Sequence, residues 1–284
     1  MNSIRKIGVI GAGTMGNGIA QACAVVGLPV TMIDISDEAV QRGVKTLSGS
    51  LDRLVKKEKL TEDAKAKALA LVKGSTQYAD LRDCDLVIEA ATENIELKLR
   101  ILRQVEDIVR DDAVVASNTS SISITQLAAV MKHPGRFIGM HFFNPVPVMA
   151  LVELIRGLQT DDAAHAVCAE FAKAIGKTPV TVRNSPGFVV NRILCPMINE
   201  AVFVLQEGLA TAEDIDAGMR LGCNHPIGPL ALADLIGLDI MLAVMKVFYD
   251  GFKDPKYRPA PLLQEMVDAG RLGRKTGRGF YSYA

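Results

Sequence analysis

The sequence carries no excess charge of either sign. Its 284 residues include 32 Lys and Arg and 32 Asp and Glu, so the formal net charge is zero. This balance argues against a general nucleic-acid binder or a membrane-surface protein, because both depend on a basic excess. We therefore expect neither nucleic acid nor a membrane among the partners.

Cysteines are few and follow no recognisable pattern. The chain has five, at positions 23, 84, 168, 195 and 223, and no two of them form a C-x-x-C pair. None has a histidine at zinc-finger spacing, so the sequence predicts no metal site. An odd number of cysteines in a chain of this size is typical of reduced, mostly buried thiols and favours a cytoplasmic location.

Long apolar runs are also missing, although one segment imitates them. Residues 7–33 contain no charged side chain. The segment nevertheless holds six glycines together with Asn17, Gln21 and Pro29, which a membrane helix tolerates poorly. A buried strand, a tight loop, a buried helix and a second buried strand explain the segment better.

Apolar strand patterns alternate with helical patterns over the first two thirds of the chain. Strands are expected at residues 6–10, 29–33, 85–89, 113–116, 137–140, 151–155 and 180–182. Between them lie amphipathic segments with helical spacing, of which residues 37–59 form the longest. Repeated β-α-β units predict an α/β fold: a Rossmann-like, doubly wound and mostly parallel sheet with helices on both faces.

The pattern changes near residue 184. Ser185 and Pro186 resemble a helix start, and the rest of the chain is almost entirely helical in character. The expected helices span residues 187–207, 212–221, 229–249 and 261–269. We therefore expect two domains, a dinucleotide-binding domain at residues 1–184 and an all-α domain at residues 185–284.

A glycine-rich loop follows the first predicted strand. It reads Gly11-Ala12-Gly13-Thr14-Met15-Gly16 and opens a predicted helix, which is the context that a dinucleotide-binding loop requires. Asp34 ends the second strand, where its carboxylate could accept a hydrogen bond from a ribose hydroxyl and would repel a 2′-phosphate. The pattern favours NAD over NADP. The alternative is an ordinary glycine turn with Asp34 capping the next helix.

Polar clusters follow three other predicted strands. They are residues 89–93, residues 117–121, and the pair His141 and Asn144. Each cluster alone is typical of loop and cap chemistry. Ligands of open α/β sheets bind beyond the carboxyl ends of the strands, so three clusters at the edge that carries the glycine loop predict a site there.

His141 and Glu153 are candidates for an acid–base pair. Strand alternation places Glu153 on the same face as Leu151 and Ile155, where a buried carboxylate is costly without a partner. A neighbouring His141 would remove that cost and would gain a fixed tautomer and a stabilised imidazolium. The alternative is a histidine that serves only the core.

The predicted helix at residues 37–59 carries a basic face. Residues 42–59 hold six basic and two acidic side chains, a net charge of +4. Ser50, Arg53 and Lys57 are spaced three and four apart, so they would line one exposed ridge. Such a ridge could hold the phosphates of a long anionic substrate. The alternative is a solvated helix face.

Taken together, these motifs make the sequence resemble the 3-hydroxyacyl-CoA dehydrogenase family over essentially its whole length. The resemblance is strongest to the short-chain bacterial members that act on (S)-3-hydroxybutyryl-CoA. It rests on the glycine loop at 11–16, the segments at 117–121, 141–145 and 185–192, and the tail at 275–281.

The resemblance implies a reversible hydride transfer between NAD(H) and 3-hydroxybutyryl-CoA or acetoacetyl-CoA. It implies a His–Glu pair at His141 and Glu153, with Ser120 and Asn191 assisting. The implied cofactor contacts, beyond the glycine loop, are Asp34, Glu93, Lys98, Asn118, Ser120, Asn144 and Lys275, and the implied substrate contacts are Ser50, Lys57, Ser120 and Asn191. It further implies a homodimer formed by the helical domain, with the active site between the two domains.

Asn191 can also be judged from the residues alone. It lies among apolar neighbours inside a predicted helix, and an asparagine in a helix interior is unfavourable unless its amide is used. That amide could instead satisfy a neighbouring buried carbonyl.

Three alternative functions remain open from the sequence. One is a longer-chain L-3-hydroxyacyl-CoA dehydrogenase of fatty-acid β-oxidation. Another is a dehydrogenase for a different β-hydroxy acid, although enzymes of that kind usually use a lysine base. The last is a non-catalytic NAD-binding protein, against which an intact His–Glu pair argues.

Overall fold

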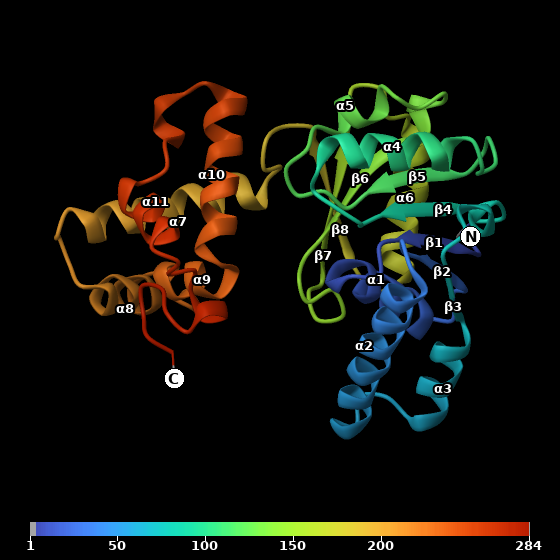
Figure 1. Cartoon of the computed structure of the whole chain (residues 1–284), viewed down its shortest axis with the longest axis horizontal. Helices are drawn as coiled ribbons and strands as arrows, with labels where there is room; N and C mark the ends of the chain where they lie inside the picture. The colour runs from blue at the N-terminus through green and yellow to red at the C-terminus, as the bar shows by residue number, and fades with distance from the viewer. Residues whose placement is uncertain (1–3, 284) are drawn as a thin grey trace. The chain divides into compact units, whose positions relative to one another are not determined.

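The computed structural model describes residues 4–283, and the chain divides into two compact units between Asn184 and Ser185 (Figure 1). The N-terminal unit is built on a sheet of eight strands, and the C-terminal unit is built from helices. Within residues 4–283 we find no helix that combines the length and the apolar character needed to cross a membrane.

The sheet of the N-terminal unit has the order β3-β2-β1-β4-β5-β6-β7-β8. All neighbouring strands run parallel except β6 and β7, which are antiparallel. The strands are β1 (Ile7–Ile10), β2 (Val30–Ile33), β3 (Val72–Ser75), β4 (Leu86–Glu89), β5 (Val114–Ser117), β6 (Phe137–Phe142), β7 (Leu151–Arg156) and β8 (Thr178–Arg183). The strand order reverses between β1 and β4, which is where doubly wound folds bind dinucleotides. The predicted fold class is confirmed.

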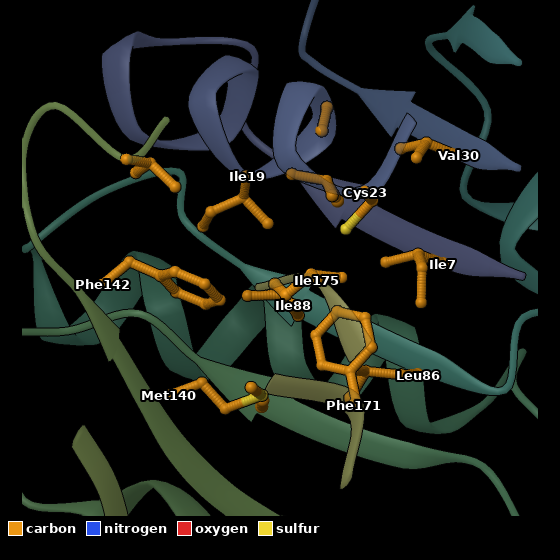
Figure 2. Packing of buried hydrophobic residues seen from close by; sticks show 14 of the residues in the cluster. Ile7, Ile19, Cys23, Val30, Leu86, Ile88, Met140, Phe142, Phe171 and Ile175 are labelled. Carbon is orange, nitrogen blue, oxygen red and sulfur yellow. The ribbon is translucent and has the colours of Figure 1, made fainter. Parts of the chain in front are cut away.

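Helices cover both faces of this sheet. They are α1 (Thr14–Val25), α2 (Asp37–Lys56), α3 (Glu62–Ala70), α4 (Ile95–Glu106), α5 (Ile124–Ala128) and α6 (Asp162–Ala174), with short 3-10 turns at Tyr78–Leu81 and Pro134–Arg136. Ile19 of α1 and Phe171 of α6 share one apolar core with Ile88 of β4, as Figure 2 shows. On the opposite face a Cβ at Gly139 would lie 2.8 Å from Ile124 of α5, so glycine lets α5 approach β6 closely.

Strand β3 was not expected from the sequence. It forms the edge of the sheet and pairs with β2 in parallel. Lys73 and Gly74 interrupt its apolar pattern, but a Cβ at Gly74 would lie 2.2 Å from Val40 of α2. The glycine therefore serves close helix packing, a requirement that a single sequence does not reveal.

The C-terminal unit contains α7 (Val190–Gln206), α8 (Ala212–Gly222), α9 (Pro229–Ile236), α10 (Leu238–Phe252) and α11 (Pro261–Asp268), with 3-10 turns at Pro255–Tyr257 and Arg274–Thr276. Two expectations were wrong. The first helix begins at Val190 and not directly after Ser185. The predicted helix at residues 229–249 is two helices, because Gly237 takes a φ of 105° that no right-handed helix contains.

Candidate active site

His141 and Glu153 face each other across the only antiparallel strand pair among the described residues. They are register partners on β6 and β7, and His141 Nδ1 lies 2.8 Å from Glu153 Oε2. His141 is 6 % exposed and Glu153 is 0 % exposed. A buried imidazole whose Nδ1 is held by a carboxylate is suited to accept or donate a proton through Nε2.

Strand alternation explains why both side chains reach this position. Met140 and Phe142 flank His141 in the sequence and belong to the apolar core under α1 and α6. His141 therefore points to the opposite face, and the same alternation applies to Glu153 between Val152 and Leu154. The ring of Phe143 lies 4.5 Å from the His141 ring, centroid to centroid, and covers one side of the pair.

The loops after β4 and β5 are tied to each other and to strand β6 by hydrogen bonds. Thr119 Oγ1 donates to Glu93 over 2.7 Å, and the Ser120 amide donates to the same carboxylate over 3.0 Å. The Phe142 amide donates to Asn118 Oδ1 over 2.9 Å. The structure thus brings together Glu93, Asn118 and Ser120 from the predicted set and links them to β6, the strand of His141.

A buried ion pair lies under the same edge of the sheet. Lys98 of α4 binds Glu89 at the end of β4, and Ser117 Oγ donates to the same carboxylate over 2.8 Å. Lys98 is 1 % exposed, so its ammonium lies inside the fold. Its predicted contact with the cofactor stays a prediction. In the sequence, this cluster is indicated by the positions of Glu89 and Ser117, each at the end of a buried strand. The structure shows that the two residues are register partners.

The glycine loop has the shape that a dinucleotide needs. Gly11 has a φ of 100°, and a Cβ at Gly16 would lie 1.7 Å from the Gly11 carbonyl oxygen. A Cβ at Gly13 would meet nothing within 4 Å, so the space above Gly13 is open to a ligand. Helix α1 begins there with no acidic residue in its first turn and no side-chain cap, which leaves its amino end suited to a pyrophosphate.

Asp34 is bound to this loop and does not cap the next helix. Its Oδ2 accepts from the Ala12 amide over 2.6 Å, and its Oδ1 accepts from the Ile35 amide over 2.7 Å. The cap of α2 is Ser36, so the alternative interpretation of Asp34 is wrong. Each carboxylate oxygen has capacity for a further hydrogen bond, which fits a ribose hydroxyl. The residues present therefore fit NAD.

Asp34→Ala is expected to weaken NADH binding about tenfold or more, because a charge-assisted hydrogen bond to the ribose is lost. Relative use of NADPH should improve, since the repulsion of a 2′-phosphate disappears. The ratio of kcat/KM for the two cofactors measures the effect, with Asp37→Ala on the exposed start of α2 as the control. A wild-type protein that prefers NADPH would contradict the assignment.

The basic ridge on α2 is only partly as expected. Helix α2 ends at Lys56, so Lys57 is its C-cap and not a residue of the helix, while Ser50 lies inside α2. Lys57 is exposed and Ser50 is half-buried. Asp52, one of the two acids of this segment, pairs with Lys65 of α3 over 2.5 Å. This ion pair neutralises Asp52, so Asp52 no longer offsets the positive charges of the ridge.

Two predicted site residues belong to the C-terminal unit. Asn191 lies in the first turn of α7 and not in a helix interior, so the cost expected for its position does not apply. The buried mid-helix asparagine is Asn199, which accepts from the Ala260 amide over 2.9 Å and donates to the Arg258 carbonyl over 3.0 Å. Lys275 pairs with Asp239 over 2.5 Å. The ligand contacts predicted for Asn191 and Lys275 stay predictions.

Comparison with known proteins identifies both parts of the chain. Residues 6–185 match the NAD binding domain of 3-hydroxyacyl-CoA dehydrogenase, and residues 187–283 match the C-terminal domain of the same family.

Full-length relatives agree with this match. A 3-hydroxybutyryl-CoA dehydrogenase of Bradyrhizobium diazoefficiens is 53 % identical and covers 99 % of this chain and 96 % of its own. The crystal structure of (S)-3-hydroxybutyryl-CoA dehydrogenase PaaH1 from Ralstonia eutropha has 71 % identity and a TM-score of 0.98, covering 99 % of this chain and 100 % of its own. With its two units matched in order over nearly the full length, and with an NAD-binding loop and a buried His–Glu pair in place, the chain belongs to the 3-hydroxyacyl-CoA dehydrogenase family.

Proposed function

We propose that this protein interconverts (S)-3-hydroxybutyryl-CoA and acetoacetyl-CoA with NAD as the redox partner. The observation that carries the proposal is the buried pair of His141 and Glu153 in a unit whose strand order and glycine loop fit NAD. The choice of a four-carbon substrate is supported by relatives at 53 % and 71 % identity that are named for 3-hydroxybutyryl-CoA.

The proton chemistry belongs to the side chains of this chain. Bound NAD supplies the hydride acceptor for oxidation at C3 of the substrate. His141 takes the proton of the 3-hydroxyl through Nε2, because Nδ1 is engaged by Glu153. The Glu153 carboxylate stabilises the imidazolium that results, and in the reverse direction His141 is the acid. Ser120 and Asn191 donate hydrogen bonds to the reacting oxygen or the thioester carbonyl.

The remaining roles follow the same proposal. Glu93, Lys98, Asn118, Asn144 and Lys275 bind or support the cofactor beside the glycine loop. The helical C-terminal unit forms a homodimer, and the protein works in the cytoplasm.

Turnover of acetoacetyl-CoA with NADH tests the function directly. A series of 3-ketoacyl-CoA substrates from about four to sixteen carbons should give its highest kcat/KM at four carbons, because discrimination is set by differential binding in the transition state. A maximum at long chains would favour a dehydrogenase of fatty-acid β-oxidation instead. Absence of turnover across the series, with NADH bound, would contradict both.

We further propose that Ser50 and Lys57 hold the nucleotide part of coenzyme A. Lys57→Ala should raise KM for acetoacetyl-CoA severalfold, and more strongly at low ionic strength, because exposed charges are screened by salt. KM for NADH should not change. KM for a truncated thioester that lacks the nucleotide should not change either. Lys45→Ala is the matched control, since Lys45 lies on another face of α2. Equal KM values for full-length and truncated thioesters in the wild type would exclude this role.

A further inference from the structure

Lys177 is a buried lysine that no other part of the proposed mechanism uses. It lies between α6 and β8 and is 9 % exposed. Its ammonium donates to the Val146 carbonyl over 2.5 Å and to the Met149 carbonyl over 2.8 Å. A lysine is rarely buried to this degree.

The two carbonyls belong to a tight turn. The Pro145 carbonyl accepts from the amides of Val148 and Met149 over 2.9 and 3.0 Å. Lys177 therefore completes the turn at residues 145–149 by satisfying carbonyl groups from inside the protein. The turn begins one residue after Asn144, on the chain that leaves β6 and His141.

The turn is also fixed from the side of the glycine loop. Val146 is 2 % exposed, and a Cβ at Gly18 of α1 would lie 2.9 Å from its Cβ. The backbone that follows Asn144 is thus held between Lys177 and the helix that starts at the glycine loop. A displacement of this turn would move Asn144 relative to the cofactor site.

The two hydrogen bonds of Lys177 come with a desolvation cost. The Val146 and Met149 carbonyls are neutral, so they compensate less of the desolvation of an ammonium than a carboxylate would. Burial accordingly lowers the pKa of Lys177 from its ordinary value. An unbranched apolar side chain of similar length would fill the same space without that cost, but it could not hold the two carbonyls.

We propose that Lys177 is a positioning residue: its ammonium fixes the turn at residues 145–149 and thereby places Asn144 against the cofactor. The proposal rests on the proposed use of NAD by this site and on the proposed contact of Asn144 with that cofactor. It predicts an effect on the affinity for NADH, which can be measured without any turnover.

Lys177→Met should raise Kd for NADH about two- to tenfold, the range expected when one neutral hydrogen bond to the cofactor is lost. Fluorescence titration with NADH measures this Kd at a temperature well below the unfolding midpoint of each variant. Lys173→Met is the matched control, because Lys173 lies exposed on α6 and forms an ion pair with the exposed Glu170. Lys177→Arg retains charge and donors and should recover much of the affinity.

A double-mutant cycle with Asn144→Ala separates positioning from a general loss of stability. If Lys177 acts through Asn144, adding Lys177→Met to Asn144→Ala should change Kd little further, whereas independent effects would add. Additive effects, or wild-type affinity in Lys177→Met, would overturn the proposal. Should Lys177→Met not fold, Lys177→Gln gives the same comparison. A wild type that binds NADH but fails to reduce acetoacetyl-CoA would contradict the proposed reaction and not the role of Lys177.

Discussion

His141→Ala is expected to lower kcat for acetoacetyl-CoA reduction by about 10²–10⁴-fold, the range typical of losing one acid–base group. The affinity for NADH should hardly change, because the substitution removes proton transfer and not a cofactor contact. Steady-state kinetics together with NADH titration separates the two effects.

The control for this variant is His165→Ala. His165 lies on α6, where its Nε2 is 2.8 Å from Thr181 Oγ1, and it has no place in the proposed chemistry. That variant should keep wild-type turnover. If His141→Ala also kept near wild-type turnover, His141 would be a core residue and the mechanism would be wrong.

Glu153→Gln is expected to lower kcat by about 10²-fold or more. The amide retains the size of the carboxylate but removes the charge that stabilises the imidazolium, and it allows the ring to be held in the wrong tautomer. Because the imidazolium then loses its proton more readily, the pH–rate profile of acetoacetyl-CoA reduction should move to lower pH. Measuring kcat between about pH 5 and 9 tests both effects.

A second buried carboxylate provides the comparison for Glu153. Glu106 is 6 % exposed and pairs with Arg136 over 2.9 Å, so Glu106→Gln also breaks a buried ion pair in the N-terminal unit. It should reduce stability without moving the pH–rate profile. If Glu153→Gln behaved in the same way, Glu153 would serve structure alone.

The glycine loop and its cofactor could be predicted from the sequence because the signal is local. The loop lies between a strand and a helix that are each recognisable within a few residues, and Asp34 directly follows the next strand. The face on which Glu153 lies also follows from strand alternation alone. The sequence indicated His141 as a candidate partner, but it did not predict the antiparallel pairing of β6 and β7 that brings the two side chains together.

Features that depend on contacts between distant segments were missed or wrongly predicted. The helix break depends on the backbone conformation of Gly237, and the edge strand β3 depends on close packing at Gly74. Propensity patterns are averaged over several residues, so they do not show the effect of one such position. The burial of Lys98 and Lys177 belongs to the same class. A lysine in the sequence is expected to lie in solvent, and only its partners in the fold show otherwise.

By itself, then, the sequence determined the alternating α/β pattern, the change to helices near residue 184, and the NAD-binding loop, because each is encoded by neighbours in the chain. Only the tertiary structure decided that Glu153 holds His141, that Glu93 holds Thr119 and Ser120, and that Lys177 holds the turn after Asn144. The physical reason is that these polar groups are paired across strands and loops, and a buried charge or hydrogen-bonding group is stable only where the fold supplies its partner.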